Sequence, residues 1–228
     1  MKPQPSRRRT LMALPLTLAV ALLGAGTLAL APLPAIAQTP DAAFEAAFAQ
    51  FQRATTGDTS AIEPAATQFG ELLAAKPADP VLRAYSGAAT ALRATTTMMP
   101  WKKMSYAEDG LAQIDKALAQ LAPAHDAPAH HGTPASLEVR LVAATTFLGL
   151  PEMFNRQARG ARLLDELLAH PLLAASPLGF RGAVWLRAGL QAARDKRIDD
   201  AKRWLQQVVS SGAPQAPQAL AQLNGLAS

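Results

Sequence analysis

WLRAGLQAARDKRIDDAKRWLQQVVSSGAP, residues 185–214, carries the strongest structural signal in this chain. It reads as two amphipathic helices joined by a short polar link, with Gly189 four residues after Trp185 and Ala201 twelve residues further on. Leu205 follows four residues later. Small residues at Gly189 and Ala201 let two antiparallel helices approach closely, while Trp185 and Leu205 fill the space around the contact. The pattern therefore predicts a tightly packed helical hairpin.

The rest of the chain has the same helical character. Apolar residues make up 50% of it but aromatic residues only 5%, so the core must be built from Ala, Leu and Val. Ala and Leu lose little side-chain freedom in a helix, and no stretch alternates apolar and polar residues as a strand would. We predict an all-α chain of about nine helices, at residues 41–54, 61–75, 80–94, 100–121, 135–148, 156–169, 177–194, 198–210 and from 214 onward.

Cap residues assign several helix starts. Asp79 followed by Pro80 predicts an N-cap and a first helical position. Ser60 with Glu63 three residues later matches a capping box, in which the two side chains bond to each other's free amides. Pro100 predicts the start of a long helix and the end of the preceding one, because it disfavours helical geometry in the residue before it.

The spacing in residues 185–214 resembles the tetratricopeptide repeat, which places a large and a small residue on the first helix and a small and a large one on the second. A second match to this repeat comprises Ala65, Phe69, Leu72, Pro77 and Gly87. Arg83 stands where the repeat has a large first-helix residue, and the middle hairpins depart further. The resemblance implies a short right-handed stack of antiparallel helical hairpins, an α-solenoid over residues 38–228. An unrelated helical bundle is the alternative.

The resemblance also implies a function. Tetratricopeptide-repeat proteins are usually scaffolds that hold a peptide or protein partner in a concave groove lined by the first helix of each hairpin, and they are rarely enzymes. In agreement, the sequence has no Gly-rich phosphate loop, Gly-x-Ser-x-Gly or His-Glu-x-x-His motif. We therefore expect a scaffold or adaptor with no catalytic residues and no cofactor.

If this chain follows the repeat, the positions that correspond to groove-facing positions hold a mixture of apolar and basic side chains. They are Val81, Tyr85, Ala88, Arg140, Leu186, Arg187, Leu190 and Arg194. Such a surface suits an extended acidic segment or a C-terminal carboxylate, because the planar guanidinium of arginine can bind a carboxylate at two points. The alternative is that these arginines pair with neighbouring acids, as surface arginines commonly do.

Residues 1–37 read as an export signal. The basic segment 6–9, a serine followed by three arginines, precedes an apolar run at 11–31, and Ala35 to Ala37 form a small-x-small cleavage site before Gln38. We expect a periplasmic or secreted protein that begins at Gln38 and has no stable membrane insertion. The apolar run is also long enough to remain as a membrane anchor, which is the alternative.

Removal of residues 1–37 changes the charge of the chain. They hold four of the 22 basic residues and none of the 17 acidic ones, so 22 − 4 = 18 basic residues remain against 17. A net charge of about +1 gives no concentrated basic footprint, and we expect no nucleic-acid partner. The chain has no cysteine, which excludes disulfides and thiol chemistry.

The stretch ATTTMMPWKKMSY, residues 94–106, is a second candidate site. Lys102 and Lys103 fall in the first turn of the helix opened by Pro100, where the helix dipole disfavours a cation by about 0.3–1 kcal/mol. Together with Trp101 they could contact an anion or an acidic partner. The alternative is that both lysines are simply solvated and cover apolar surface with their stems.

The Pro/His-rich segment 123–134 holds a cluster of histidines, His125, His130 and His131. Exported proteins use such tracts to bind metals, so a metal or small-ligand carrier based on this segment or on the Trp101 region is the alternative function. The segment is rich in proline and lacks a second spaced set of ligands. We therefore expect an unstructured surface loop rather than a metal site.

Overall fold

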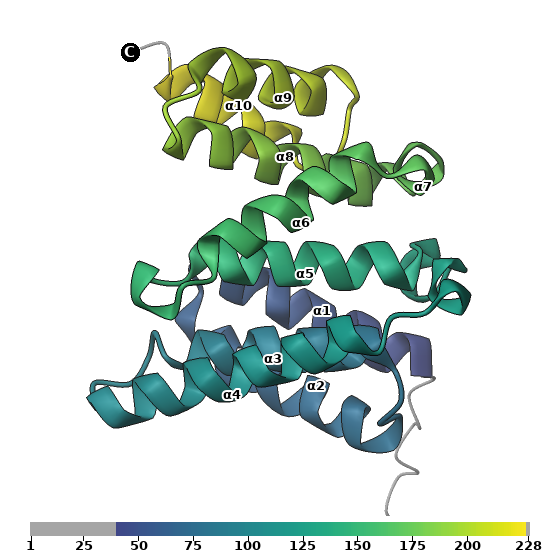
Figure 1. Ribbon diagram of the computed structural model, residues 1–228, viewed down its shortest axis with the longest axis vertical. Helices are drawn as coiled ribbons and strands as arrows, with labels where there is room; N and C mark the ends of the chain where they lie inside the picture. Colours follow the sequence, from purple (N-terminus) through teal and green to yellow (C-terminus); the bar gives the residue numbers. More distant parts are fainter. Residues whose placement is uncertain (1–39, 227–228) are drawn as a thin grey trace, which may run out of the picture. The chain divides into compact units, whose positions relative to one another are not determined.

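The chain divides into two units, residues 1–37 and Gln38–Ser228, of which only the second holds residues that the structure describes. The computed structural model describes residues 40–226, so the expected export signal lies outside the described residues. Within them the chain is all-α, as predicted, with ten α-helices and no strand (Figure 1). The helices are α1 Pro40–Thr55, α2 Ile62–Ala75, α3 Pro80–Arg93, α4 Pro100–Ala119, α5 Ala135–Gly149, α6 Gln157–Ala169, α7 Pro171–Ala175, α8 Leu178–Arg194, α9 Ile198–Ser210 and α10 Ala216–Gly225.

Successive helices pack as hairpins. The pairs α1–α2, α3–α4, α5–α6 and α8–α9 are each in contact, and α10 covers α9 (Figure 1). Consecutive hairpins are joined by further contacts of α2 with α3, α3 with α5, and α6 with α8. The five-residue helix α7 was not predicted, because it is too short to show a helical period in the sequence.

The core lies mainly on the first helix of each hairpin, and its clusters are formed by residues between Phe44 and Leu226. Helix α3 is buried along almost its whole length, because α2, α4 and α5 pack around it and α1 supplies aromatic side chains. Since residues 38–228 form one compact unit with its own core, they are expected to fold without residues 1–37. Among the described helices, none has both the length and the apolar character needed to cross a membrane.

Burial of α3 corrects one part of the predicted groove. Val81, Tyr85 and Ala88 were expected to be open to a partner, but their exposed fractions are 0%, 6% and 2%. The aromatic residues of α1 cover them: the ring centroids of Phe48 and Phe51 lie 5.7 and 5.1 Å from that of Tyr85. The sequence pattern of α3 could not show that another helix packs across it.

The helix caps agree with the sequence in two places and differ in one. Asp79 accepts hydrogen bonds from the amides of Val81 and Leu82, with Pro80 in the first turn, and Pro100 opens α4, both as predicted. The capping box at Ser60 is wrong. Asp58 accepts the amide of Ser60 instead and starts a short 3₁₀ turn at Thr59–Ala61 that leads into α2.

The Pro/His-rich segment differs from the unstructured loop that we expected. It forms two 3₁₀ turns, Pro123–Asp126 and His130–Gly132, and then leads into α5. The ring of His130 stacks on Phe44 with centroids 4.0 Å apart, and its Nε2 lies 3.1 Å from Oδ2 of Asp79. His131 Nδ1 lies 3.1 Å from Oε1 of Glu45. The segment thus contacts both α1 and the residue that caps the start of α3.

The α8–α9 hairpin contains the close contact predicted from Gly189. A Cβ atom added at Gly189 would lie 2.7 Å from Cγ of Leu205, and Trp185 shares a buried cluster with Leu205. We expect Gly189→Leu to lower the free energy of unfolding by about 1–3 kcal/mol, because the longer side chain must displace α9. Chemical unfolding followed by circular dichroism measures this change.

The matched control is Gly70→Leu on α2, where an added Cβ would meet nothing within 4 Å. This variant should keep the wild-type free energy of unfolding to within about 1 kcal/mol. Equal stabilities for both variants would contradict the close contact between α8 and α9.

Candidate functional site

Two adjoining cavities form a groove on the described unit. The first has a volume of about 340 Å³ and the second about 220 Å³. Five residues line both cavities: Phe51, Thr55, Thr145, Thr146 and Arg187. The remaining lining residues come mainly from α1, α3, α5 and α8, with two glutamines at the start of α10. We refer to this surface as the Arg187 groove.

Helical spacing explains which side chains of α5 and α8 enter the groove. On α8, Leu186 and Leu190 are four residues apart and so lie on one face, next to Arg187. The opposite face of α8, with Trp185 and Gly189, packs against α9. On α5 the groove is lined by Leu141, Val142, Thr145, Thr146 and Gly149, which are likewise grouped four residues apart.

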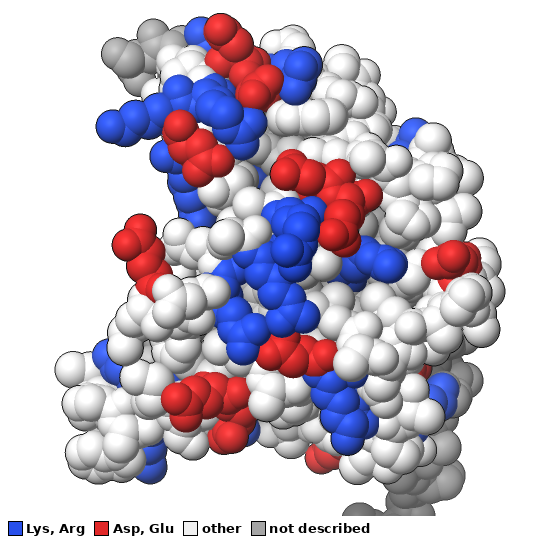
Figure 2. All heavy atoms as spheres, viewed as in Figure 1, with Lys and Arg blue, Asp and Glu red and all other residues white. Residues whose placement is uncertain are grey.

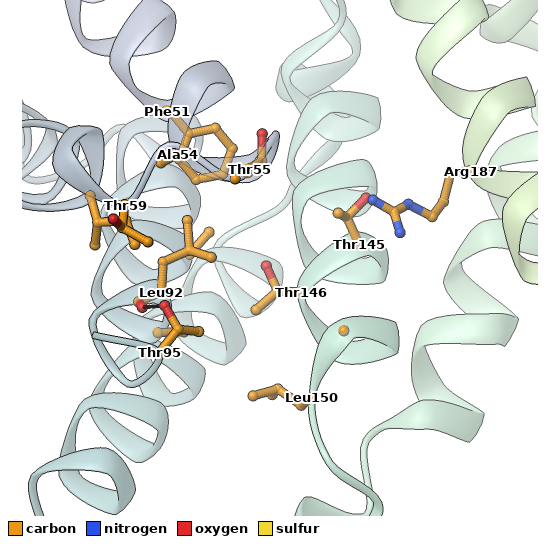
Figure 3. A pocket seen from close by; sticks show the side chains of 15 residues that line it. Phe51, Ala54, Thr55, Thr59, Leu92, Thr95, Thr145, Thr146, Leu150 and Arg187 are labelled. Carbon is orange, nitrogen blue, oxygen red and sulfur yellow. Dashed lines mark hydrogen bonds between the residues drawn. The ribbon is translucent and has the colours of Figure 1, made fainter. Parts of the chain in front are cut away.

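Arg187 is the most informative residue of the groove. Its side chain reaches from α8 toward Thr145 of α5, while Phe51 and Leu92 lie on the far side of the cavity (Figure 3). Among the arginines of residues 40–226, it is the one for which no hydrogen bond, ion pair or ring contact is found. Burial, and then the positive charge of Arg194, lower the pKa of Arg187 below its ordinary value. A partly desolvated guanidinium without a counter-ion favours an anionic ligand.

The other two predicted arginines have partners. Arg194 donates from Nη1 to the carbonyl oxygen of Leu148 at 3.0 Å, and Arg140 donates from Nη1 to that of Ser136 at 2.9 Å. Neither lines the two cavities. Of the predicted groove residues, Leu186, Arg187 and Leu190 therefore lie together, Tyr85 contributes only part of the wall, and Arg140 and Arg194 lie outside it.

Threonine hydroxyl groups line the groove. Thr55, Thr95 and Thr146 donate their hydroxyls to carbonyl oxygens of their own helices, at 2.9, 2.7 and 2.9 Å. Thr145 is different, because no hydrogen bond of its hydroxyl is found although it lies in front of Arg187 (Figure 3). A ligand held by Arg187 would therefore meet a free hydroxyl group beside the cation.

A buried acid pair lies behind the wall of the groove. Tyr85 donates its hydroxyl to Oε1 of Glu138 at 2.9 Å, and Oε2 of Glu138 has no hydrogen-bond partner. Burial raises the pKa of Glu138 to about 7, against the lowering effects of the Tyr85 hydrogen bond and the nearby His130. Burial, together with the adjacent Glu138, also raises the pKa of Tyr85 well above its ordinary value.

The Trp101 region is separate from the groove. Trp101 is 69% exposed, Lys102 and Lys103 are exposed in the first turn of α4, and none of the three lines either cavity. No ion pair of the two lysines is found in the described part of the chain.

The three histidines have separate partners. His125 Nδ1 accepts the amide of Ala122 at 2.9 Å, whereas His130 and His131 lie against Asp79 and Glu45. Within residues 40–226, no group of three or more His, Asp or Glu side chains is placed so as to hold a metal ion. The structure therefore does not bring the three histidines of this segment together.

Sequence reasoning missed Glu138, Thr145 and the aromatic wall of α1. Glu138 had a signal, because it is the only acidic residue in a helix whose other residues are largely apolar. A lone carboxylate on such a helix is a candidate for burial. Thr145 and Phe51 had no signal, because their place in the groove depends on how distant helices pack.

The surface outside the groove carries both signs of charge. On the face drawn in Figure 2, basic side chains gather across the middle and acidic side chains border them. Arg156 and Arg159 both lie within ion-pair distance of Asp115, at 2.9 and 2.5 Å. These arginines are thus already neutralised in part, unlike Arg187.

Comparison with known proteins gives no match, whether to a family model, to a curated protein or to a solved structure.

Proposed function

We propose that this chain is an exported helical scaffold or adaptor, similar to tetratricopeptide-repeat proteins, that binds an extended segment of a peptide or protein partner in the Arg187 groove. Its role is binding rather than catalysis. The observation that carries the proposal is Arg187, a partly buried cation without a counter-ion between two apolar cavities.

The chemistry of the groove supports a carboxylate on the ligand. Arg187 can hold a carboxylate through two parallel N–H···O bonds, and the partly desolvated position strengthens that attraction relative to bulk water. Both cavities adjoin Arg187, so a bound carboxylate would have apolar space on either side. A C-terminal carboxylate or an acidic side chain flanked by apolar residues fits this arrangement.

The walls of the groove support an extended peptide. Gln52 of α1 and Gln218 of α10 face the second cavity, and no hydrogen bond of either side-chain amide is found. Side-chain amides can bond both the N–H and the C=O groups of a peptide backbone. Leu186 and Leu190 line the same cavity and offer apolar contacts for the side chains of the peptide.

Peptide capture tests the proposal. Protein comprising residues 38–228 is immobilised and used to enrich peptides from a random pool, and the enriched peptides are then resynthesised for calorimetry. We expect Arg187→Gln to weaken binding about 10- to 100-fold, because a hydrogen bond to a charged group contributes about 1.5–3 kcal/mol. Replacing the ligand carboxylate with its amide should have a similar effect.

Arg140→Gln is the matched control. It removes the same charge from α5, but Arg140 does not line the groove and bonds only to its own helix. Peptide affinity should remain at the wild-type value in this variant. If Arg187→Gln and the wild type enrich the same peptides with equal affinity, Arg187 does not hold the ligand and the proposal is wrong.

A further inference from the structure

Apolar side chains are exposed on two neighbouring hairpin tips. Met98, Met99 and Trp101, in and just after the α3–α4 link, are 88%, 43% and 69% exposed, and Met153 in the α5–α6 link is 67% exposed. They are four of the six exposed large apolar residues in the described part of the chain. We refer to these four residues as the Met/Trp edge.

The two tips project from the same side of the molecule. Leu92 and Thr95, at the end of α3, line the same cavity as Gly149 and Leu150, at the end of α5. Arg156, which follows the second link, pairs with Asp115 of α4 at 2.9 Å. Figure 1 shows both links at the left of the view, one above the other.

The first tip holds its apolar residues outward. Thr95 and Thr96 donate their hydroxyls to the carbonyl oxygens of Leu92 and Arg93, at 2.7 and 3.0 Å, and thereby close the end of α3. The amide of Met99 donates to Oγ1 of Thr97, and Pro100 starts α4 immediately afterwards. Because the backbone is tied on both sides of Met98 and Met99, their exposure is built into the fold. Large apolar side chains held exposed in this way are candidates for an interaction site.

Positive charge lies beside the edge. Lys102 and Lys103 follow Trp101, and no carboxylate partner is found for either among the described residues. The acidic residues nearest in sequence to members of the Met/Trp edge are Glu152, which precedes Met153, and Glu108 and Asp109, which lie further along α4 than Trp101. The lower left of Figure 2, where Figure 1 places the start of α4, is mostly uncharged surface with both basic and acidic side chains at its margins.

We propose that the Met/Trp edge docks this protein on the surface of a lipid bilayer that contains anionic phospholipids. Tryptophan favours the membrane–water interface, methionine side chains can enter the boundary of the acyl chains, and lysines attract anionic headgroups. A protein partner needs a complementary surface of about 800 Å² on each side, whereas a fluid bilayer accepts two narrow tips without a matching shape. Docking is peripheral. It places the part of the Arg187 groove that is formed by the ends of α3 and α5 next to the bilayer.

Vesicle sedimentation tests the docking with residues 38–228, which exclude the apolar run of the export signal. Binding is measured to vesicles of phosphatidylcholine alone and of equimolar phosphatidylcholine and phosphatidylglycerol. We expect preferential binding to the anionic vesicles, and a loss of about tenfold or more in partitioning for Met98→Ser with Trp101→Ser. Lys102→Gln with Lys103→Gln should lose about 25-fold in partitioning on anionic vesicles only, since each lysine near the surface contributes about fivefold.

Matched controls separate the edge from the rest of the surface. Ile198→Ser removes another exposed apolar side chain, on α9, and Lys202→Gln removes another exposed lysine, also on α9. Both should partition as the wild type does. Arg187→Gln should also retain vesicle binding, because docking does not depend on the function proposed for the groove.

Absence of wild-type binding to anionic vesicles would overturn the inference. Equal partitioning of the wild type and the Met98→Ser/Trp101→Ser variant would overturn it as well. If that variant instead loses an acidic protein partner while vesicles are never bound, the edge is a protein-binding surface and the bilayer is the wrong occupant.

Discussion

Gly110→Ala is expected to lower the free energy of unfolding by about 3 kcal/mol, at the upper end of the usual cost of overpacking. Helices α3 and α4 meet backbone to backbone at Gly87 and Gly110. A Cβ atom on Gly110 would lie 2.5 Å from the carbonyl oxygen of Gly87 and 2.8 Å from the amide nitrogen of Ala91. Neither atom belongs to a side chain that can rotate away, so the two helices must separate and open the core around Ile114.

Thermal unfolding followed by circular dichroism measures the effect, and a fall in Tm of about 10 °C is expected for a chain of this length. Gly70→Ala is the control, since a Cβ there meets nothing within 4 Å. It should leave the stability unchanged or raise it by up to about 1 kcal/mol, because alanine is the better helix former. An unchanged Tm for Gly110→Ala would mean that α3 and α4 lie further apart than described.

The second large effect is a loss of stability with rising pH that depends on Glu138. This carboxyl has a pKa of about 7 in the folded chain, raised mainly by burial from an ordinary value of 4.5. The folded chain therefore holds the Glu138 proton more tightly than the unfolded chain does. The stabilising contribution is complete below pH 4.5, falls as the pH rises, and is lost above about pH 7. The shift corresponds to about 3 kcal/mol.

Glu138→Gln should remove this pH dependence. The amide oxygen of glutamine can still accept the hydroxyl hydrogen bond of Tyr85, but the side chain is neutral at every pH. At about pH 8 the variant should unfold with a free energy up to about 3 kcal/mol higher than that of the wild type, and near pH 4.5 the two should be similar. Urea unfolding at both pH values provides the comparison.

Glu108→Gln is the control for the change in net charge, because Glu108 is exposed on α4. Asp79 and His130 also lie near Glu138, and both residues are retained in all of these proteins. A Glu138→Gln protein that keeps the wild-type slope of stability against pH would show that Glu138 is ionised without penalty in the folded state.

Local signals in the sequence were sufficient for most helix boundaries. Asp79 and Pro80 cap α3, and Pro100 opens α4, because caps and prolines act within one helical turn. The exceptions were also local in origin: Asp58 accepts the Ser60 amide that the capping box assigns to Glu63, and α7 has too few residues to show a period. Where two possible cap residues lie two positions apart, residue types alone do not show which of them accepts the amide hydrogen bond.

The candidate site was predictable only where one hairpin decides the geometry. Leu186, Arg187 and Leu190 were predicted to share one face of α8, and they line one cavity together because Trp185 and Gly189 turn the opposite face of α8 toward α9. Tyr85 was placed wrongly as an open residue, because the rings that cover it, Phe69 of α2 and Phe51 of α1, belong to a different hairpin.

The sequence by itself determined that this chain is all-α, where most of its helices begin and end, and which face of α8 packs on α9, since these depend on residues within one helix or one hairpin. Only the tertiary structure decided that α1 covers α3, that Tyr85 meets Glu138 across 53 residues, and that Arg187 has no counter-ion. The physical reason is that burial and pairing depend on distances between helices far apart in the chain, which no local pattern of residues specifies.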